Sequence, residues 1–342
     1  MNLVGRCLLW PLESFVYGPA YGTVQFLIRS PQPLDPKKTW DFLSGDVAPP
    51  LEWVRVRWPL WFMREWLVAA KLRQDHVLGI SEHYDVSNDF YELFLDKKYM
   101  FYTCADFPTG RETIEEAQTI KADFILNLLQ PKAGEKILEL GCGWGPMLKR
   151  IYEETGDKEN LYGYTISQKQ VDYNRQHNGF NVEFKNFITS DYPENFFDKI
   201  YSIGAWEHVR PKEVPMVLAK LYKALKPGGM LMHHFFCRPN EMVPSTYPVA
   251  QIFFPGTVSD SYRHQIRCFE AAGFRIGHQS IHDYRDTLRA WFDRLAANRD
   301  RALELVGVRT YNRYLVFFAA CWRYFQEVIA MLLRITLIKP AN

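Results

Sequence analysis

The sequence is short of paired cysteines, of long uncharged apolar runs and of net charge. Its six cysteines form no C-x-x-C pair and no regular spacing, which argues against a zinc site or a disulfide framework. No stretch reaches the roughly 18 uncharged apolar residues that a membrane-spanning helix needs. Pro11 and Glu13 interrupt the first apolar segment, where a signal peptide would be continuous. A net charge of +2 argues against nucleic acid as the main partner. We therefore expect a cytoplasmic protein without a bound metal.

Aromatic side chains, in contrast, are abundant and make up 15% of the 342 residues. Residues 51–80 mix tryptophan and leucine with basic side chains, among them Arg55, Arg57 and Arg64. Such a segment suits a membrane interface, where its cations would lie near lipid phosphates, and it suits equally a helical layer packed on the rest of the protein. The length of the chain predicts one main domain and an extension. We expect a helical extension over residues 1–80, either at a membrane interface or packed on the rest of the protein, and a main domain over residues 81–342.

A glycine-rich turn is the most informative local feature. Residues 137–145 form a short apolar strand that leads into a turn with Gly141, Gly143 and Gly145. Glycine permits positive φ and close approach of the backbone to a ligand, and the helix that follows presents free N–H groups. The dinucleotide pattern G-x-G-x-x-G is absent, and the carboxylate of Glu139 suits a cationic ligand. The turn therefore favours S-adenosylmethionine over NAD, although glycines also occur in turns that bind nothing.

From residue 112 onward, segments typical of helices and strands alternate. Helices are expected over residues 113–129, 145–155 and from about 167, and strands over residues 136–140, 160–165, 181–185, 198–203 and 230–236. This alternation predicts a parallel sheet with right-handed crossovers, which binds ligands outside the carboxyl ends of its strands. Residues 315–333 are expected to form a buried amphipathic helix, followed by a strand over residues 334–339.

Several polar residues fall near the expected carboxyl ends of these strands. Glu207 and His208 follow one strand, and His233 lies in the next. Taken singly, a histidine or a glutamate at such a place is more often structural. Cys104 alone would be a small buried apolar residue, and Tyr284 alone would be a core aromatic. Only their coincidence around one expected pocket makes them candidates for a functional site.

Taken together, these segments resemble the cyclopropane-fatty-acid synthase family, which includes the mycolic acid cyclopropane synthases and methyltransferases. The resemblance covers about residues 80 to 342. It is carried by the segments at residues 83–91, 102–105, 138–145, 165–170, 202–208, 253–256 and 283–288. It implies an α/β fold with the Rossmann-like sheet of class I methyltransferases, mostly parallel and seven-stranded, with helical lid insertions and an α-helical N-terminal extension.

The resemblance also implies a reaction. In this family the double bond of an acyl chain attacks the sulfonium methyl of S-adenosylmethionine, which leaves a carbocation beside the new branch. A bound bicarbonate then removes a proton from the transferred methyl, and the cyclopropane ring closes. Bicarbonate held by donors in a dry pocket can act as a base, and aromatic faces can stabilise the cation.

The residues that the resemblance assigns to these tasks fall into two sets. The bicarbonate-holding positions are Cys104 through its backbone, Glu207, His233 and Tyr284, with a further backbone contact near Phe235. The positions that contact S-adenosylmethionine are Tyr102, Thr103, Gly141, Gly143, Gly145, Thr165, Ile166 and Gln170, to which the glycine turn adds Glu139. The implied partners are an unsaturated phospholipid or acyl chain and a membrane surface, to which the protein would bind peripherally; a homodimer is compatible with the sequence.

Some segments depart from the family pattern. Residues 186–188 lack the acidic residue that many class I methyltransferases use near the adenine, and the turn at residues 255–261 has a different sequence. His282 is displaced by one position from the histidine that usually precedes Tyr284. A methyl or methylene branch is therefore an open alternative to the cyclopropane. Methylation of a small-molecule amine and a non-catalytic lipid-binding role are further alternatives.

Overall fold

The computed structural model describes residues 19–45, 87–241, 243, 250–254 and 258–341, and the chain divides into two compact units. The first unit takes in Met1–Phe94, Glu241–Ser259 and Leu288–Ile329, and the second takes in Leu95–Asn240, Asp260–Thr287 and Ala330–Asn342. The basic tryptophan-bearing segment at residues 51–80, the motif at residues 83–86 and the turn at residues 255–257 lie outside the described residues.

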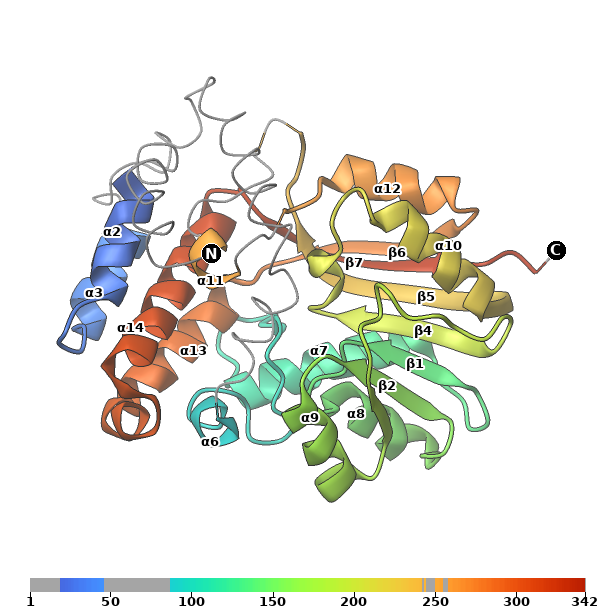
Figure 1. Cartoon of the computed structure of the whole chain (residues 1–342), viewed down its shortest axis with the longest axis horizontal. Coiled ribbons are helices and arrows are strands. Elements are labelled where there is room, and N and C mark those ends of the chain that lie inside the picture. The colour runs from blue at the N-terminus through green and yellow to red at the C-terminus, as the bar shows by residue number, and fades with distance from the viewer. Residues whose placement is uncertain (1–18, 46–86, 242, 244–249, 255–257, 342) are drawn as a thin grey trace, which may run out of the picture. The chain divides into compact units, whose positions relative to one another are not determined.

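The described part of the first unit is helical. It contains α2 (Pro19–Ile28), α3 (Pro36–Ser44), α6 (Asn88–Tyr91), α11 (Ala250–Phe253), most of α13 (Arg285–Ala297) and α14 (Arg299–Gln326). Helices α2 and α3 pack along α14 (Figure 1). The ring of Trp40 on α3 meets those of Phe292 and Trp322 edge to face, at centroid distances of 4.8 and 5.5 Å. Asn312 on α14 accepts a hydrogen bond from the backbone N–H of Leu34, so both polar and aromatic contacts hold residues 31–45 in this unit.

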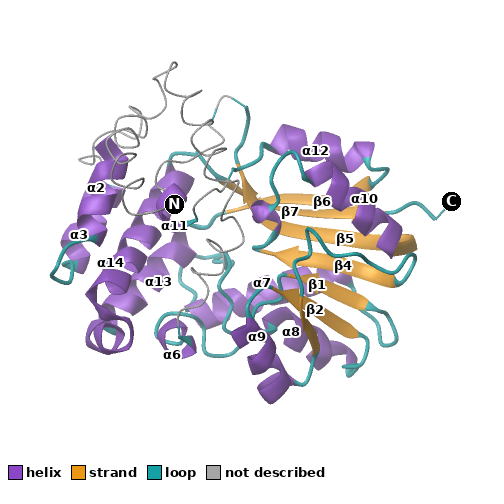
Figure 2. Cartoon of the chain, in the orientation of Figure 1, coloured by secondary structure: helices purple, strands orange, loops and turns teal. Residues whose placement is uncertain are grey.

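The second unit is built on a seven-stranded sheet in the order β3-β2-β1-β4-β5-β7-β6 (Figure 2). Its strands are β1 (Ile137–Leu140), β2 (Leu161–Thr165), β3 (Asn181–Phe184), β4 (Phe197–Ile203), β5 (Leu225–Cys237), β6 (Arg275–His282) and β7 (Met331–Ile338). Strands β1 to β5 pair in parallel, whereas β7 runs antiparallel between β5 and β6. The expected mostly parallel, seven-stranded α/β fold is confirmed.

Helices cover both faces of this sheet (Figure 1). One face carries α10 (Val214–Ala224) and α12 (Tyr262–Ala271), and the other carries α7 (Ile114–Leu129), α8 (Pro146–Thr155) and α9 (Gln168–Tyr173), which continues as the π-helix η1 (Asn174–Asn178). Helix α7 begins at the expected place, because Thr113 and Glu116 form a capping box that satisfies the first backbone N–H groups. The 3-10 turn η2 (Trp206–His208) follows β4.

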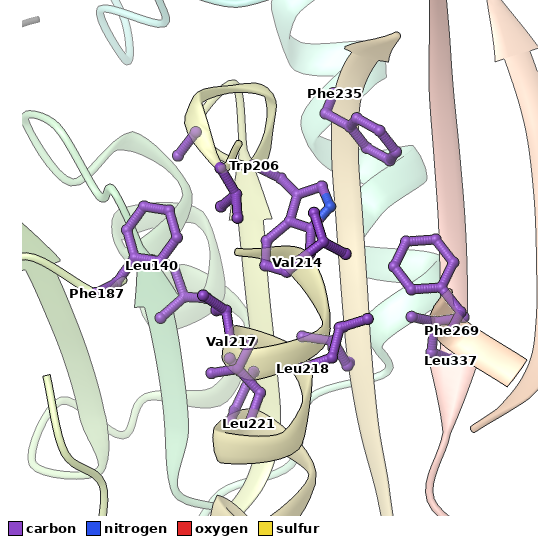
Figure 3. Close-up of a cluster of buried hydrophobic side chains, with 14 of the residues drawn as sticks. Leu140, Phe187, Trp206, Val214, Val217, Leu218, Leu221, Phe235, Phe269 and Leu337 are labelled. Carbon is purple, nitrogen blue, oxygen red and sulfur yellow. The ribbon is translucent and has the colours of Figure 1, made fainter. Parts of the chain in front are cut away.

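The larger apolar core lies between the sheet and helices α10 and α12. Leu140 from β1 lies toward Val217 of α10, Leu337 from β7 lies beside Phe269 of α12, and the indole of Trp206 belongs to the same cluster (Figure 3). All of these side chains are almost completely buried. The core therefore fixes the loop that carries Glu207, because Trp206 directly precedes it.

One expectation about secondary structure is wrong. Residues 315–333 do not form a single helix, because α14 ends at Gln326 and β7 begins at Met331. The last part of this stretch enters the interior of the sheet, where residues on both faces of β7 are buried. A continuous apolar run of this kind has no strict alternation, so it fits a buried strand as well as a helix.

Candidate functional site

The three glycines of the turn after β1 adopt positive φ, with values of 73° at Gly141, 57° at Gly143 and 78° at Gly145. A Cβ at Gly141 would lie 2.5 Å from the Cβ of Ala205, so this glycine lets the turn pack against the loop after β4. Among the described residues, a Cβ at Gly143 would instead meet only the side-chain amide of Gln170, at 4.0 Å. Gly143 is thus the member of the turn whose backbone faces open space, as a ligand-binding turn requires.

The loop after β2 presents a fixed amide to this turn. The hydroxyl of Thr165 donates to Oε1 of Gln170 at 2.6 Å, which leaves the Nε2 donors of Gln170 directed toward Gly143. Asn174 donates to the backbone carbonyl of Gly143 at 2.9 Å and so ties the π-helix to the turn. Sequence reasoning missed Asn174, although its place one helical turn after Gln170 was visible. Half-buried Ile166 lies in the same loop.

A second close approach occurs at Gly204, directly after β4, where side chains lie against the glycine. A Cβ at this glycine would lie 2.6 Å from Cγ2 of Thr103 and 3.9 Å from Oε1 of Glu207. Two residues that the sequence assigns to different ligands, Thr103 and Glu207, are therefore neighbours at the carboxyl end of β4. Helix α7 holds the segment of Thr103 in place, since Gln118 donates to its carbonyl and Lys121 to its hydroxyl, each at 2.9 Å.

Lys121 itself is completely buried, with its ammonium group 3.2 Å from the centroid of the Phe101 ring. Burial lowers the pKa of this lysine, and the positive charge of Arg334 lowers it further. The hydroxyl of Thr103 accepts from Lys121 and so keeps its own hydrogen for another partner. Thr103 is in this way prepared to donate to a ligand. The neighbouring Tyr102 is half-buried.

The two candidate carboxylates have similar surroundings. Burial raises the pKa of Glu207 to about 8, and its Oε2 has no hydrogen-bond partner among the described residues. Burial also raises the pKa of Glu139 to about 8, although the hydroxyl of Tyr201 donates to it at 2.9 Å. Glu139 lies below the glycine turn with only 2% of its surface exposed. Both groups can hold a proton near neutral pH, but only Glu207 has an oxygen left for a ligand.

His233 lies on the face of β5 that joins the larger core. Its Nδ1 pairs with the hydroxyl of Ser202 at 2.7 Å, and its ring stacks on Trp206 at a centroid distance of 4.1 Å. Burial lowers the pKa of His233 to about 3, so the ring is neutral. Its Nε2 is buried and has no partner within the described part of the chain.

The next residue, His234, lies on the opposite face of β5 and was not singled out from the sequence. Its Nδ1 receives a hydrogen bond from Nε of Arg334 at 2.9 Å, and its backbone carbonyl accepts from Gly204 at 2.8 Å. Burial lowers its pKa well below the usual value, and the charges of Arg334 and Lys121 add to this effect. The sequence signal for His234 was the pair of adjacent histidines. Adjacent residues of a strand point to opposite faces, so such a pair places one imidazole on each face of the sheet.

Hydrogen bonds bring the segment of Cys104 near that of Tyr284. The thiol of Cys104 is fully buried and donates to the carbonyl of Asp283, which precedes Tyr284, at 3.3 Å. Burial raises the pKa of this thiol to about 12, so it is not a thiolate nucleophile. The hydroxyl of Thr287 accepts from the backbone N–H of Ala105 at 2.9 Å and ties the same two segments together. The thiol is therefore structural, and a contribution of Cys104 through its backbone stays a prediction.

These contacts place most of the expected site residues along one edge of the sheet. The glycine turn touches the loop after β4, that loop touches Thr103, and Cys104 touches the segment of Tyr284. The edge combines glycine backbone, fixed donors and buried polar atoms that lack partners among the residues described, as a site for a polar ligand should. None of the described helices is long and apolar enough to cross a bilayer.

The comparisons with known proteins agree with this geometry. The family model for mycolic acid cyclopropane synthetase matches residues 71–335 of the chain. A probable fatty acid methyltransferase of Mycobacterium tuberculosis is 31% identical over 284 residues, which cover 80% of this chain but only 64% of the relative. Cyclopropane mycolic acid synthase 1 of the same organism is 30% identical over 271 residues, which cover 73% of this chain and 93% of that enzyme.

Solved structures show the same similarity to mycolic acid cyclopropane synthases. The crystal structure of mycolic acid cyclopropane synthase CmaA1 in complex with SAH and CTAB matches with a TM-score of 0.68 and 28% identity. The match covers 78% of this chain and 99% of that one.

Proposed function

The chain belongs to the mycolic acid cyclopropane synthetase family, and from this premise we propose that it transfers a methylene group from S-adenosylmethionine to the double bond of an unsaturated acyl chain. The observation that carries the proposal is the shared edge of the sheet at Gly204, where Thr103 of the cofactor segment lies beside Glu207. We propose a cyclopropane as the product and a phospholipid as the carrier of the acyl chain. Peripheral membrane binding in the cytoplasm follows from that substrate.

The cofactor part of the proposal is supported by the turn and its neighbours. S-adenosylmethionine supplies an electrophilic methyl group when it is bound. The open space at Gly143 and the amide of Gln170 fit its polar end, and the free hydroxyl hydrogen of Thr103 provides another donor. Tyr102, Gly141, Gly145, Thr165 and Ile166 complete the proposed contacts. Glu139 is buried and accepts a hydrogen bond from Tyr201, so it would support the glycine turn from inside the protein.

The proposed base is a bicarbonate ion, which supplies a proton acceptor when it is bound. Two buried atoms without protein partners among the described residues, Oε2 of Glu207 and Nε2 of His233, suit such an ion, and Tyr284 and the backbone of Cys104 complete the proposed set. With a pKa of about 8, the carboxyl group of Glu207 is protonated at neutral pH and donates to an anion without repelling it. Burial also excludes water, which would otherwise solvate the base.

A fatty acid methyltransferase that leaves a methyl or methylene branch is the second candidate. The 31% identity to a probable fatty acid methyltransferase favours it. The two reactions share the attack of the double bond on the methyl group and differ only in how the resulting cation loses its charge.

Transfer of label from S-adenosylmethionine tests the acceptor. Incubated with vesicles of unsaturated phospholipid, the protein should move the labelled methyl carbon into the acyl chains, because only a double bond provides the attacking electron pair. Vesicles with the same headgroup and saturated chains are the matched control and should remain unlabelled. Equal labelling of both, or label in an amine headgroup, would contradict carbon methylation of an acyl double bond.

Vesicle sedimentation tests the proposed interfacial extension. If Arg55, Arg57, Arg64, Trp58 and Trp61 form a membrane-facing surface, the protein should sediment with anionic vesicles at low salt. Salt should release it, because the Debye length shrinks from about 30 Å at 0.01 M to about 3 Å at 1 M. Removal of the first 75 residues or so should weaken binding and spare the affinity for S-adenosylmethionine. Binding that ignores both salt and truncation would leave this segment as a packing layer.

A further inference from the structure

Arg334 on β7 makes an unusually complete set of contacts for a buried cation. Its side chain has no exposed surface. Its Nη1 and Nη2 donate to the two oxygens of Asp106 at 2.6 and 2.8 Å, and its Nε donates to Nδ1 of His234 at 2.9 Å. The guanidinium group also lies 5.0 Å from the centroid of the Phe124 ring. With both ends of the guanidinium held, the orientation of its Nε–H bond is fixed.

This orientation determines where His234 carries its proton. A guanidinium group can only donate, so Nδ1 of His234 must be the acceptor. The pKa of His234 is lowered well below its usual value by burial and by the charge of Arg334, so the ring is neutral and its single hydrogen is on Nε2. In His233, by contrast, Nδ1 pairs with a serine hydroxyl, which can donate or accept and leaves either tautomer open.

The resulting N–H donor at Nε2 of His234 is buried and has no partner within the described residues. Its surroundings favour an acceptor that carries negative charge. Two charged groups, Arg334 and Lys121, act both on His234 and on the thiol of Cys104, so the two residues share part of one electrostatic environment. A buried polar group of this kind is normally satisfied by a ligand or by water.

Asp106 completes the arrangement by holding Arg334 in place. Although burial alone would raise its pKa, hydrogen bonds from His282 and Arg334 lower the pKa of Asp106 to about 2. Asp106 is therefore ionised throughout the physiological range. Its two oxygens fix the plane of the guanidinium group, and its charge balances that of Arg334.

We propose that Arg334 and Asp106 are positioning residues that fix His234 as an Nε2–H donor for the anion bound in the candidate site. Because His233 and His234 lie on opposite faces of β5, His234 takes the place given to His233 above. The identity of that anion as bicarbonate rests on the proposed function. The position of the donor does not, because it follows from the contacts of Arg334 alone. Neither residue touches the reacting atoms; both act through the imidazole.

A matched pair of variants isolates the single hydrogen bond. Both carry Asp106→Asn, so that no charge is left buried without a partner, and they differ only in Arg334→Gln against Arg334→Met. Glutamine places an N–H donor as many bonds from Cα as Nε of arginine, whereas methionine places a methyl group there. The two side chains have similar size, so a difference between the variants reports the donor and not the packing.

Two readouts apply to these full-length proteins. Nitrogen NMR of histidine-labelled protein, with the His234 signal assigned by its loss in His234→Gln, shows which ring nitrogen is protonated. We expect Nε2–H in the wild type and in the glutamine variant, and a mixture of tautomers in the methionine variant. Loss of one buried hydrogen bond should raise the half-saturating concentration of added bicarbonate about tenfold in the methionine variant relative to the glutamine variant. Affinity for S-adenosylmethionine should be equal in both.

The inference is overturned if His234 has the same tautomer and the same bicarbonate dependence in both variants. A wild type whose rate ignores bicarbonate would instead contradict the proposed function. In that case a difference in the His234 tautomer between the two variants would still show that Arg334 positions the imidazole.

Discussion

Replacing Glu207 with glutamine should lower turnover by a factor of about 100 to 10,000, the usual cost of losing general-base catalysis, because Glu207 holds the proposed bicarbonate base. With a pKa of about 8, the buried carboxyl group can deliver or accept a proton near neutral pH, and an amide of the same shape cannot. Affinity for S-adenosylmethionine should remain nearly unchanged, because the lost interaction matters only after methyl transfer has begun. Steady-state rates and calorimetry measure the two quantities separately.

Exposed Glu270 on α12 offers a matched control, since Glu270→Gln makes the same chemical change away from the site and should leave turnover unchanged. After degassing, bicarbonate should stimulate the wild type strongly, and should stimulate Glu207→Gln and Tyr284→Phe much less. Near-normal rates in both variants, together with indifference to bicarbonate, would show that the proposed site of deprotonation is wrong.

Valine at Gly143 should abolish binding of S-adenosylmethionine. The residue has a φ of 57°, which a β-branched side chain resists at a cost of roughly 1–3 kcal/mol, and the new side chain would fill the space that faces Gln170. Folding should survive, because in the described part of the chain no atom beyond the two neighbouring residues lies closer than 4.0 Å to the position of a Cβ at Gly143. Calorimetric titration with S-adenosylmethionine measures the effect.

Gly110→Val separates backbone strain from loss of the binding surface. Gly110 has a φ of 72°, and a Cβ there would meet nothing within 4 Å in the described ranges, so this variant carries similar strain outside the glycine turn. It should lose comparable stability and bind S-adenosylmethionine normally. Wild-type affinity in Gly143→Val would mean that the cofactor lies elsewhere.

The sequence predicts the sheet well because its local signals agree with one another. The capping box at Thr113 marks the start of α7, and the glycines after β1 adopt the positive φ values expected of them. Prediction fails at the end of α14, where an apolar run passes from a helix into a buried strand. Periodicity cannot locate that change, because residues on both faces of β7 are buried.

The candidate site was less completely predictable. Motif spacing identifies Thr103 and Glu207 separately, but their proximity depends on the close approach at Gly204, which no local pattern encodes. His234 escaped notice because its role depends on Arg334, a hundred residues away in sequence, whose contacts appear only when β7 pairs with β5. Residues that position other residues carry little local signal.

The most direct test of the proposed reaction counts deuterium in the product. The protein is incubated with S-adenosylmethionine that carries a fully deuterated methyl group and with unsaturated phospholipid, and the acyl chains are analysed by mass spectrometry. Ring closure to a cyclopropane requires loss of one deuteron from the transferred methyl, so the new carbon should keep two of its three deuterium atoms. A new carbon that keeps all three deuterium atoms would mean a methyl branch, and one that keeps two in a C=CD2 group, which mild hydrogenation of the chains reveals by a gain of two mass units, would mean a methylene branch. Either result would contradict the cyclopropane synthase proposed above.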